Sequence, residues 1–203
     1  MSNQKKTRIF SMAKTKDLLI DVARRLFAEK GMENTTMNDI ATESGKGRRT
    51  LYTYFNSKED IYLAIVEKEL QFLYEKLYEI EKMDIAPDEK LKSYIFIRLD
   101  TFKEIISRNG TIQASFFQNV HEVEKVRRSI ERKEIRILKN IFSDGIEQGI
   151  FRLGNAQWAA EITLNMLKGL EKPYYRKPFY QKMQQRKELF IDALFNGFVI
   201  KKD

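Results

Sequence analysis

Two adjacent arginines, Arg48 and Arg49, have the side chains in this sequence best suited to recognising another molecule. Each guanidinium group can donate two parallel hydrogen bonds to O6 and N7 of a guanine base, or to phosphate oxygens. Thr50 and Thr53 follow closely and carry hydroxyl groups that can contact bases. The alternative is a solvated helix end, where these groups meet only water and counterions. We favour the first interpretation, which predicts binding to double-stranded DNA.

The surrounding segment, residues 36–58, has the pattern of two short helices and the start of a third. Thr36 is a typical helix N-cap. Apolar residues recur behind it at helical spacing, at Met37, Ile40 and Ala41. Gly45 can end this helix, because glycine adopts a left-handed backbone without steric cost. Leu51 and Phe55 then lie four apart on the inner face of the second helix. The segment is therefore predicted to be a helix-turn-helix whose second helix enters the major groove.

The rest of the chain also has the pattern of helices and turns. A scaffold helix is predicted at Thr15–Lys30, ended by Gly31, and residues 57–60 resemble a capping box that opens a long helix toward Met83. The remaining predicted helices are Asp88–Ser107 after Pro87, a short segment at Thr111–Val120, a long one from His121, one capped by Asn155, and one at Tyr180–Ile200. No strand-like alternation of useful length is present. The predicted fold is all-α with about nine helices.

Three motifs resemble the amino-terminal domain of TetR-family transcriptional regulators. They are LFAEKG at the end of the scaffold helix, DIA in the first short helix, and TLYxYF followed by SK at residues 50–58. The resemblance implies a helix-turn-helix DNA-binding domain at 15–60 and a helical effector-binding and dimerisation domain at 61–203. Two positions depart from the family pattern: Lys46 replaces a small apolar residue, and Gly47 replaces a capping residue. We expect the second short helix to start less firmly, with Lys46 as an additional phosphate contact.

The same resemblance implies further DNA contacts. Tyr52, Tyr54 and Lys58 match tyrosines and a lysine that contact phosphates in the family. Thr36 can present a backbone N–H to a phosphate, because helix N-termini favour anions. For Tyr52, packing in the core is an equally good interpretation.

Composition limits the possible classes of protein. The net charge is +8, and residues 1–14, predicted to be a basic tail, contain Lys5, Lys6, Arg8 and Lys14 without any acid. Such an arm suits an anionic partner, although a solubilising tail has the same composition. Cysteine is absent, and no apolar run approaches the roughly 20 residues that span a bilayer. The amino terminus lacks a secretory signal, so we expect a cytoplasmic protein without membrane partners.

The predicted body is rich in aromatic residues, which can line a ligand cavity or fill a core. A mostly apolar or aromatic small molecule would suit such a cavity. The candidate ligand-binding residues are Tyr94, Phe96, Phe102, Phe116, Phe117, His121, Trp158 and Met166. His121 is the only histidine, and its alternative is an ordinary helix-start residue. The resemblance favours the cavity, since such regulators generally bind an effector in this domain.

The last two predicted helices carry apolar residues that suit a two-fold interface between copies of the chain. The candidate residues are Trp158, Leu170, Leu189, Phe190, Leu194 and Phe198. A helix-turn-helix usually reads paired half-sites, which favours this interface over an internal core.

Enzyme chemistry finds little support. One histidine and no cysteine leave no usual catalytic triad, no His or Cys metal cluster, and no reason to expect a cofactor. The sequence predicts a homodimeric, ligand-responsive regulator of transcription, most simply a repressor of a palindromic operator. The alternatives are a DNA-associated structural or adaptor protein of the same fold without an effector, and a helical enzyme or carrier for apolar molecules.

Overall fold

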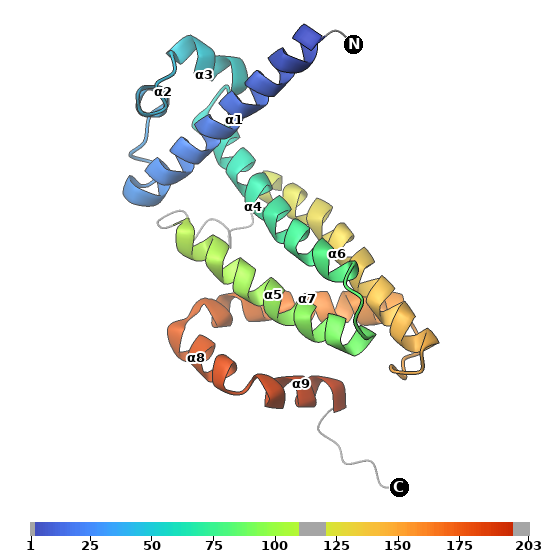
Figure 1. Cartoon of the computed structure of the whole chain (residues 1–203). Helices are drawn as coiled ribbons and strands as arrows, with labels where there is room; N and C mark the ends of the chain where they lie inside the picture. Colours follow the sequence, from blue (N-terminus) through green and yellow to red (C-terminus); the bar gives the residue numbers. More distant parts are fainter. Residues whose placement is uncertain (1–2, 110–120, 197–203) are drawn as a thin grey trace, which may run out of the picture. The chain divides into compact units, whose positions relative to one another are not determined.

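The computed structural model describes residues 3–109 and 121–196, with side chains from residue 11. These ranges contain nine α-helices and no strand, which confirms the predicted all-α class (Figure 1). The helices are α1 Asn3–Lys30, α2 Met37–Glu43, α3 Arg48–Tyr54, α4 Lys58–Glu81, α5 Pro87–Arg108, α6 His121–Glu147, α7 Ala156–Tyr175, α8 Lys177–Gln185 and α9 Lys187–Asn196. The predicted helix at Thr111–Val120 lies outside the described residues.

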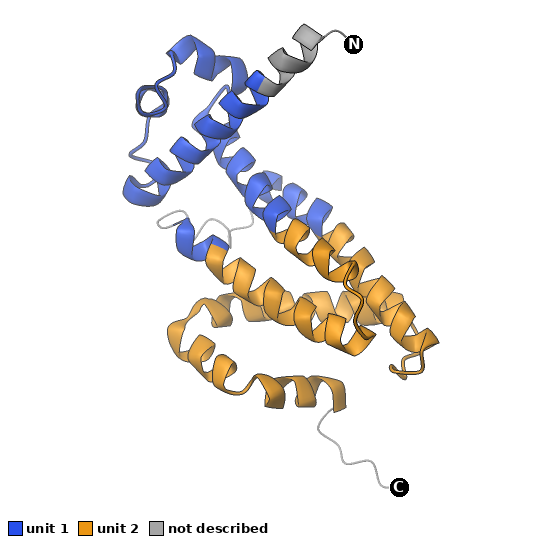
Figure 2. Ribbon diagram, in the orientation of Figure 1, with its two compact units in different colours: residues 1–72, 105–130 blue, residues 73–104, 131–203 orange. Residues whose placement is uncertain are grey.

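The chain divides into two compact units (Figure 2). Unit 1 contains residues 1–72 and 105–130, and unit 2 contains residues 73–104 and 131–203. Helices α4, α5 and α6 each contribute residues to both units. This division is not the predicted boundary at residue 60, which marks the DNA-binding part of the chain and remains a prediction.

Unit 1 holds the predicted helix-turn-helix, with α2 and α3 beside α1 (Figure 1). Its core combines the apolar faces of these helices with the first half of α4. The fully buried side chains include Leu19, Phe27, Ile40, Leu51, Ile61 and Ile65. Gly31 ends α1 with a φ of 86°, as its position in the sequence predicted.

Helix α1 begins at Asn3, so the predicted tail at residues 1–14 is wrong for the described residues 3–14. No Gly or Pro occurs between residues 3 and 30, and good helix formers such as Lys, Arg, Met and Ala dominate the start of the segment. The basic charge without any acid marked this segment as a tail. Helix propensity and continuity with the buried part of α1 carry the helix through it.

Unit 2 packs α5, α6 and α7 around a buried arginine. Arg98 on α5 donates from Nε to Glu134 on α6 at 2.7 Å and from Nη2 to Glu171 on α7 at 2.8 Å. Tyr94 donates its hydroxyl to Glu134 at 2.9 Å. All four side chains are buried. Burial alone would lower the pKa of Arg98, but the attraction of Glu134 and Glu171 raises it above the ordinary value, so the arginine is charged.

The carboxy-terminal helices differ from the prediction. Helix α7 continues through Pro173 to Tyr175, and an additional helix, α8, begins at Lys177 with Pro178 in its first turn. The single final helix predicted from Tyr180 is divided at Arg186, where the backbone leaves helical geometry with φ −130° and ψ 32°. Proline is tolerated in a first turn because its missing N–H has no helical partner there. Asn155, by contrast, caps α7 as predicted, accepting from the N–H of Trp158 at 2.9 Å.

Gly145 lies in the last turns of α6 and is covered by the ring of Phe151. A Cβ at this position would overlap that ring, which also packs against Phe142 and Phe195 at centroid distances of 5.5 and 6.3 Å. We predict that Gly145→Ala lowers the free energy of unfolding by about 1–3 kcal/mol, because the ring must leave its packed position. Gly154→Ala is the control, since nothing lies within 4 Å of a Cβ there. Chemical denaturation measures both, and equal stability of the two variants would contradict the prediction.

Candidate nucleic-acid interface

Helix α2 begins with a reciprocal capping box. The Thr36 hydroxyl accepts from the N–H of Asp39 at 3.1 Å, and the Asp39 carboxylate accepts from the N–H of Thr36 at 2.9 Å. The predicted N-cap is therefore confirmed, and its acidic partner is a residue that sequence reasoning missed. The hydrogen bond from the Thr36 N–H and a second one from Lys30 lower the pKa of Asp39. The two hydrogen bonds between Thr36 and Asp39 fix the position of the N-terminus of α2.

The turn between α2 and α3 has the geometry that its glycines predicted. Gly45 has a φ of 64°, and the N–H groups of Gly45 and Lys46 donate to Thr42 and Ala41 carbonyls at 3.0 Å each. Gly47 is the N-cap of α3 and makes no side-chain cap bond. Helix α3 therefore starts without the side-chain hydrogen bond that a Ser at this position would supply, as the departure from the family pattern predicted.

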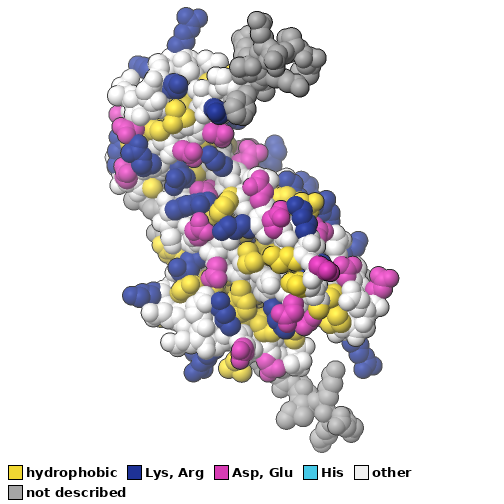
Figure 3. Space-filling view, viewed as in Figure 1, with side chains coloured by type: hydrophobic (Ala, Val, Ile, Leu, Met, Phe, Trp, Pro, Cys, Tyr) yellow, Lys and Arg dark blue, Asp and Glu magenta, His cyan; other side chains and the backbone are white. Residues whose placement is uncertain are grey.

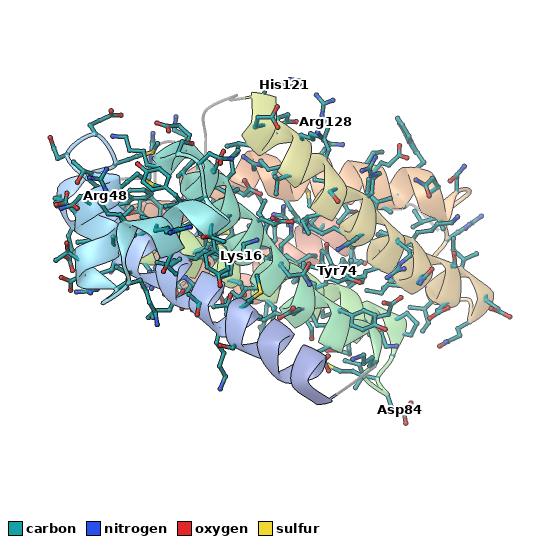
Figure 4. All side chains as sticks on the ribbon, turned by 90° about the horizontal axis from the view of Figure 1, so that it is seen from above. Lys16, Arg48, Tyr74, Asp84, His121 and Arg128 are labelled. Atoms are coloured by element: carbon teal, nitrogen blue, oxygen red, sulfur yellow. The ribbon has the colours of Figure 1, made fainter. Side chains whose placement is uncertain are left out.

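Helix α3 is held by one face and exposes the other. Leu51 and Phe55 are buried, as predicted, whereas Arg48 and Arg49 are exposed at the opposite side. Figure 4 shows the Arg48 side chain at the outer edge of this region, and Figure 3 shows Lys and Arg side chains projecting from it. Within the described residues, neither guanidinium takes part in a salt bridge or hydrogen bond. Both are therefore available to an anionic partner.

The remaining candidates on and around α3 vary in exposure. Tyr52 is 45% exposed, which argues against the core-packing alternative. Thr53 is exposed, but its hydroxyl donates to the carbonyl of Arg49 at 2.9 Å, so only its acceptor sites are open to a base. Thr50, Tyr54 and Lys46 are half-buried.

Four predicted DNA-binding residues line one surface hollow of about 460 Å³ in unit 1: Thr36, Arg48, Tyr52 and Lys58. They come from the N-terminus of α2, from α3, and from the first residue of α4. The start of α2, the first residue of α4, an arginine and a phenol therefore surround the same space, together with Glu33 and Glu59. The N–H groups of Thr36, Asp39 and Asp60 are already bonded within the two caps, so the predicted contact from the Thr36 N–H to a phosphate would have to replace its bond to Asp39. The groups in this hollow that suit a phosphate are the guanidinium of Arg48 and the phenol of Tyr52.

Lys58, which was predicted to contact a phosphate, is hydrogen-bonded to the backbone of unit 1. Its ammonium group donates to the carbonyls of Met32, Glu33 and Thr35 at 2.9, 3.3 and 3.4 Å.

The predicted capping box at the start of α4 is present in altered form. Ser57 accepts from the N–H of Asp60 at 3.1 Å, whereas the Asp60 carboxylate accepts from Asn56, one residue before the expected partner.

Comparison with known proteins agrees with this geometry. A sequence profile of the family described as bacterial regulatory proteins, tetR family, matches residues 19–65, which include α2, α3 and the start of α4. Residues 19–65 therefore carry the amino-terminal domain of the TetR family. A relative in Bacillus subtilis, the uncharacterized HTH-type transcriptional regulator YerO, is 31% identical over 133 residues, which are 58% of this chain and 46% of that protein. The match thus spans less than half of YerO.

Solved structures of regulators extend the similarity in fold beyond residue 65. A transcriptional regulator from Cytophaga hutchinsonii superposes with a TM-score of 0.72 at 26% identity, covering 88% of this chain and 95% of that one. The regulator FadR from B. subtilis, in complex with stearoyl-CoA, superposes with a TM-score of 0.68 at 22% identity, covering 90% and 98%. The second similarity concerns the fold alone.

The described residues that were predicted to bind a ligand differ widely in exposure. Tyr94 and Phe102 are buried, with the Tyr94 hydroxyl bonded to Glu134, while Met166 is half-buried. Trp158 is 63% exposed, and His121 is exposed at the start of α6 (Figure 4). Trp158 and His121 therefore do not line an enclosed cavity in this structure. Phe116 and Phe117 lie outside the described residues.

Phe96 lines an open groove of about 420 Å³ in unit 2. The groove runs between α5 and α9, and its apolar residues are Phe96, Ile191 and Phe195. The ammonium group of Lys187 lies 4.8 Å above the Phe96 ring centroid. Sequence reasoning identified only Phe96 among these residues, because the approach of α9 to α5 depends on the break at Arg186.

The predicted interface residues divide by exposure. Leu189 on α9 is 60% exposed, and Ile162 on α7, which was not predicted, is 50% exposed one turn from Trp158. Leu170, Phe190 and Leu194 are half-buried, and Phe190 packs edge-on against Phe96 at 6.2 Å. Phe198 lies outside the described residues. No helix in the described part of the chain is long and apolar enough to cross a membrane.

Proposed function

We propose that this TetR-family chain is a homodimeric repressor that a small molecule releases from a palindromic operator. The observation that carries the proposal is the exposed, unpaired pair Arg48 and Arg49 on a helix whose other face is anchored by Leu51. A recognition helix needs this combination, since the buried face fixes its orientation and the exposed donors read base edges. The predicted DNA-binding residues around the hollow would contact the flanking phosphates.

The proposed effector is mostly apolar. The aromatic groove between α5 and α9 supports this, as does the similarity in fold to FadR, whose structure was solved in complex with stearoyl-CoA. An effector that binds better to the conformation with misplaced DNA-binding helices lowers operator affinity by its preference between the two states. Helix α4 contributes residues to both units, so it is the proposed route of the coupling. A role on DNA also agrees with the predicted cytoplasmic location.

Selection from a random pool of duplex DNA tests the proposal. The full chain should enrich a palindromic sequence with two half-sites about one helical turn apart, since each protomer presents one α3 helix. Adding stearoyl-CoA as an apolar probe should then release the enriched duplex, measured by fluorescence anisotropy. Enrichment without release would leave a DNA-binding protein with a different effector, and no enrichment at low salt would refute the proposal.

The proposed dimer yields a separate prediction. We expect Leu189→Glu to shift the chain from dimer to monomer at micromolar concentration, because it places a charge in a buried apolar contact. Sedimentation velocity measures the change. Leu18→Glu is the control, since Leu18 is 41% exposed and lies on α1, which carries none of the proposed interface residues. A variant at Leu189 that stays dimeric would exclude this face of α9 from the interface.

A further inference from the structure

Lys58 uses all of its hydrogen-bonding capacity inside unit 1. An ammonium group has three donors and no acceptor. The Lys58 ammonium faces three backbone carbonyls, those of Met32, Glu33 and Thr35, at 2.9–3.4 Å. A phosphate contact would therefore require Lys58 to give up a backbone partner.

The three carbonyls belong to the loop that connects α1 to α2. This loop is also held from within, because the Thr35 hydroxyl donates to the carbonyl of Gly31 at 2.8 Å and the Thr35 N–H donates to Met32 at 3.2 Å. Thr35 is 1% exposed, and the next residue is Thr36, the N-cap of α2. Lys58 thus joins the first residue of α4 to the segment that sets where α2 begins.

We propose that Lys58 is a positioning residue for DNA binding and not a phosphate contact. It holds the α1–α2 loop so that the N-terminus of α2 stays beside Arg48 and Tyr52 in the hollow that would receive a phosphate. This inference rests on the proposed function, because it assigns Lys58 a role in the proposed DNA binding. A displacement of the start of α4 would move this loop, and with it the N-terminus of α2.

Substitution of Lys58 in the full chain tests this role on the duplex obtained by selection. Lys58→Met keeps an unbranched apolar stem and removes the donors, and we expect about tenfold weaker binding. The slope of log affinity against log salt should stay near the wild-type value. Lys46→Met is the matched control: Lys46 has no side-chain partner in the described residues, and losing a phosphate contact there should make the slope shallower by about 0.9.

Two further measurements separate a positioning role of Lys58 from an effect of its positive charge and from a general loss of protein stability. Lys58→Arg keeps the charge, but its planar fork does not match three convergent carbonyls, so we expect it to bind as weakly as Lys58→Met. Without DNA, hydrogen exchange at the amides of Thr35 and Thr36 should be faster in Lys58→Met, while amides of α7 exchange as in the wild type.

The proposal is overturned if Lys58→Arg binds like the wild type, if Lys58→Met reduces the salt slope as much as Lys46→Met, or if exchange at Thr35 and Thr36 is unchanged. Failure of the proposed DNA-binding function gives a different result from failure of this inference, because the wild-type chain would then enrich no duplex. Exchange measured without DNA would still decide whether Lys58 holds the loop.

Discussion

Replacing Arg98 by Met should lower the free energy of unfolding by about 3–5 kcal/mol. Arg98 is 2% exposed and supplies hydrogen bonds to two buried carboxylates, Glu134 and Glu171. Its removal leaves two like charges in the core without their common cation, and breaking a buried ion pair from one side costs far more than an exposed pair contributes. Chemical denaturation at neutral pH measures the loss.

A second variant separates the charge from the packing. In Arg98→Met/Glu134→Gln/Glu171→Gln the core has the same size and no unpaired charge, so much of the lost stability should return. Arg128→Met is the surface control. Arg128 meets Glu124 at 3.4 Å with a side chain that is 70% exposed, so its loss should change stability by less than about 1 kcal/mol. If Arg98→Met were as stable as the wild type, the three helices would not depend on this cluster.

The buried cluster also shows what the sequence could not predict. Glu134 and Glu171 lie 36 and 73 residues from Arg98 and were indistinguishable from the many solvated acids in mixed charge runs. No local pattern marks a charged residue as buried, because the pairing depends on how α5, α6 and α7 pack. Tyr94 was predicted as a ligand contact for the same reason: helical spacing identifies an inward position, but not what the side chain meets there.

The DNA-binding part was predictable because its signals are local. The capping role of Thr36, the positive φ of Gly45 and the burial of Leu51 each depend on a few neighbouring residues and the backbone geometry that they require. The structure confirms these features. Lys58 marks the limit of such reasoning, since its three acceptors lie in a loop more than 20 residues away.

Loss of either arginine of α3 should weaken binding to the selected duplex much more than binding to random DNA. A good bidentate contact to a base discriminates by about 1–3 kcal/mol, so Arg48→Ala and Arg49→Ala should each lower affinity for the selected duplex by about 5- to 150-fold. Fluorescence anisotropy with selected and random duplexes at the same salt concentration measures both affinities. The ratio between them reports base reading.

The same experiment distinguishes the role of each arginine. An arginine that contacts only phosphate should weaken both duplexes equally and make the salt dependence shallower, because one fewer counterion is released. Arg128→Ala is the matched control, since it removes the same charge from an exposed position on α6. Folding of each variant is checked by thermal unfolding, where exposed side chains such as Arg48 should have little effect. If neither arginine variant changed either affinity, α3 would not be the recognition helix, and the exposed donors at its start would be a solvated helix end after all.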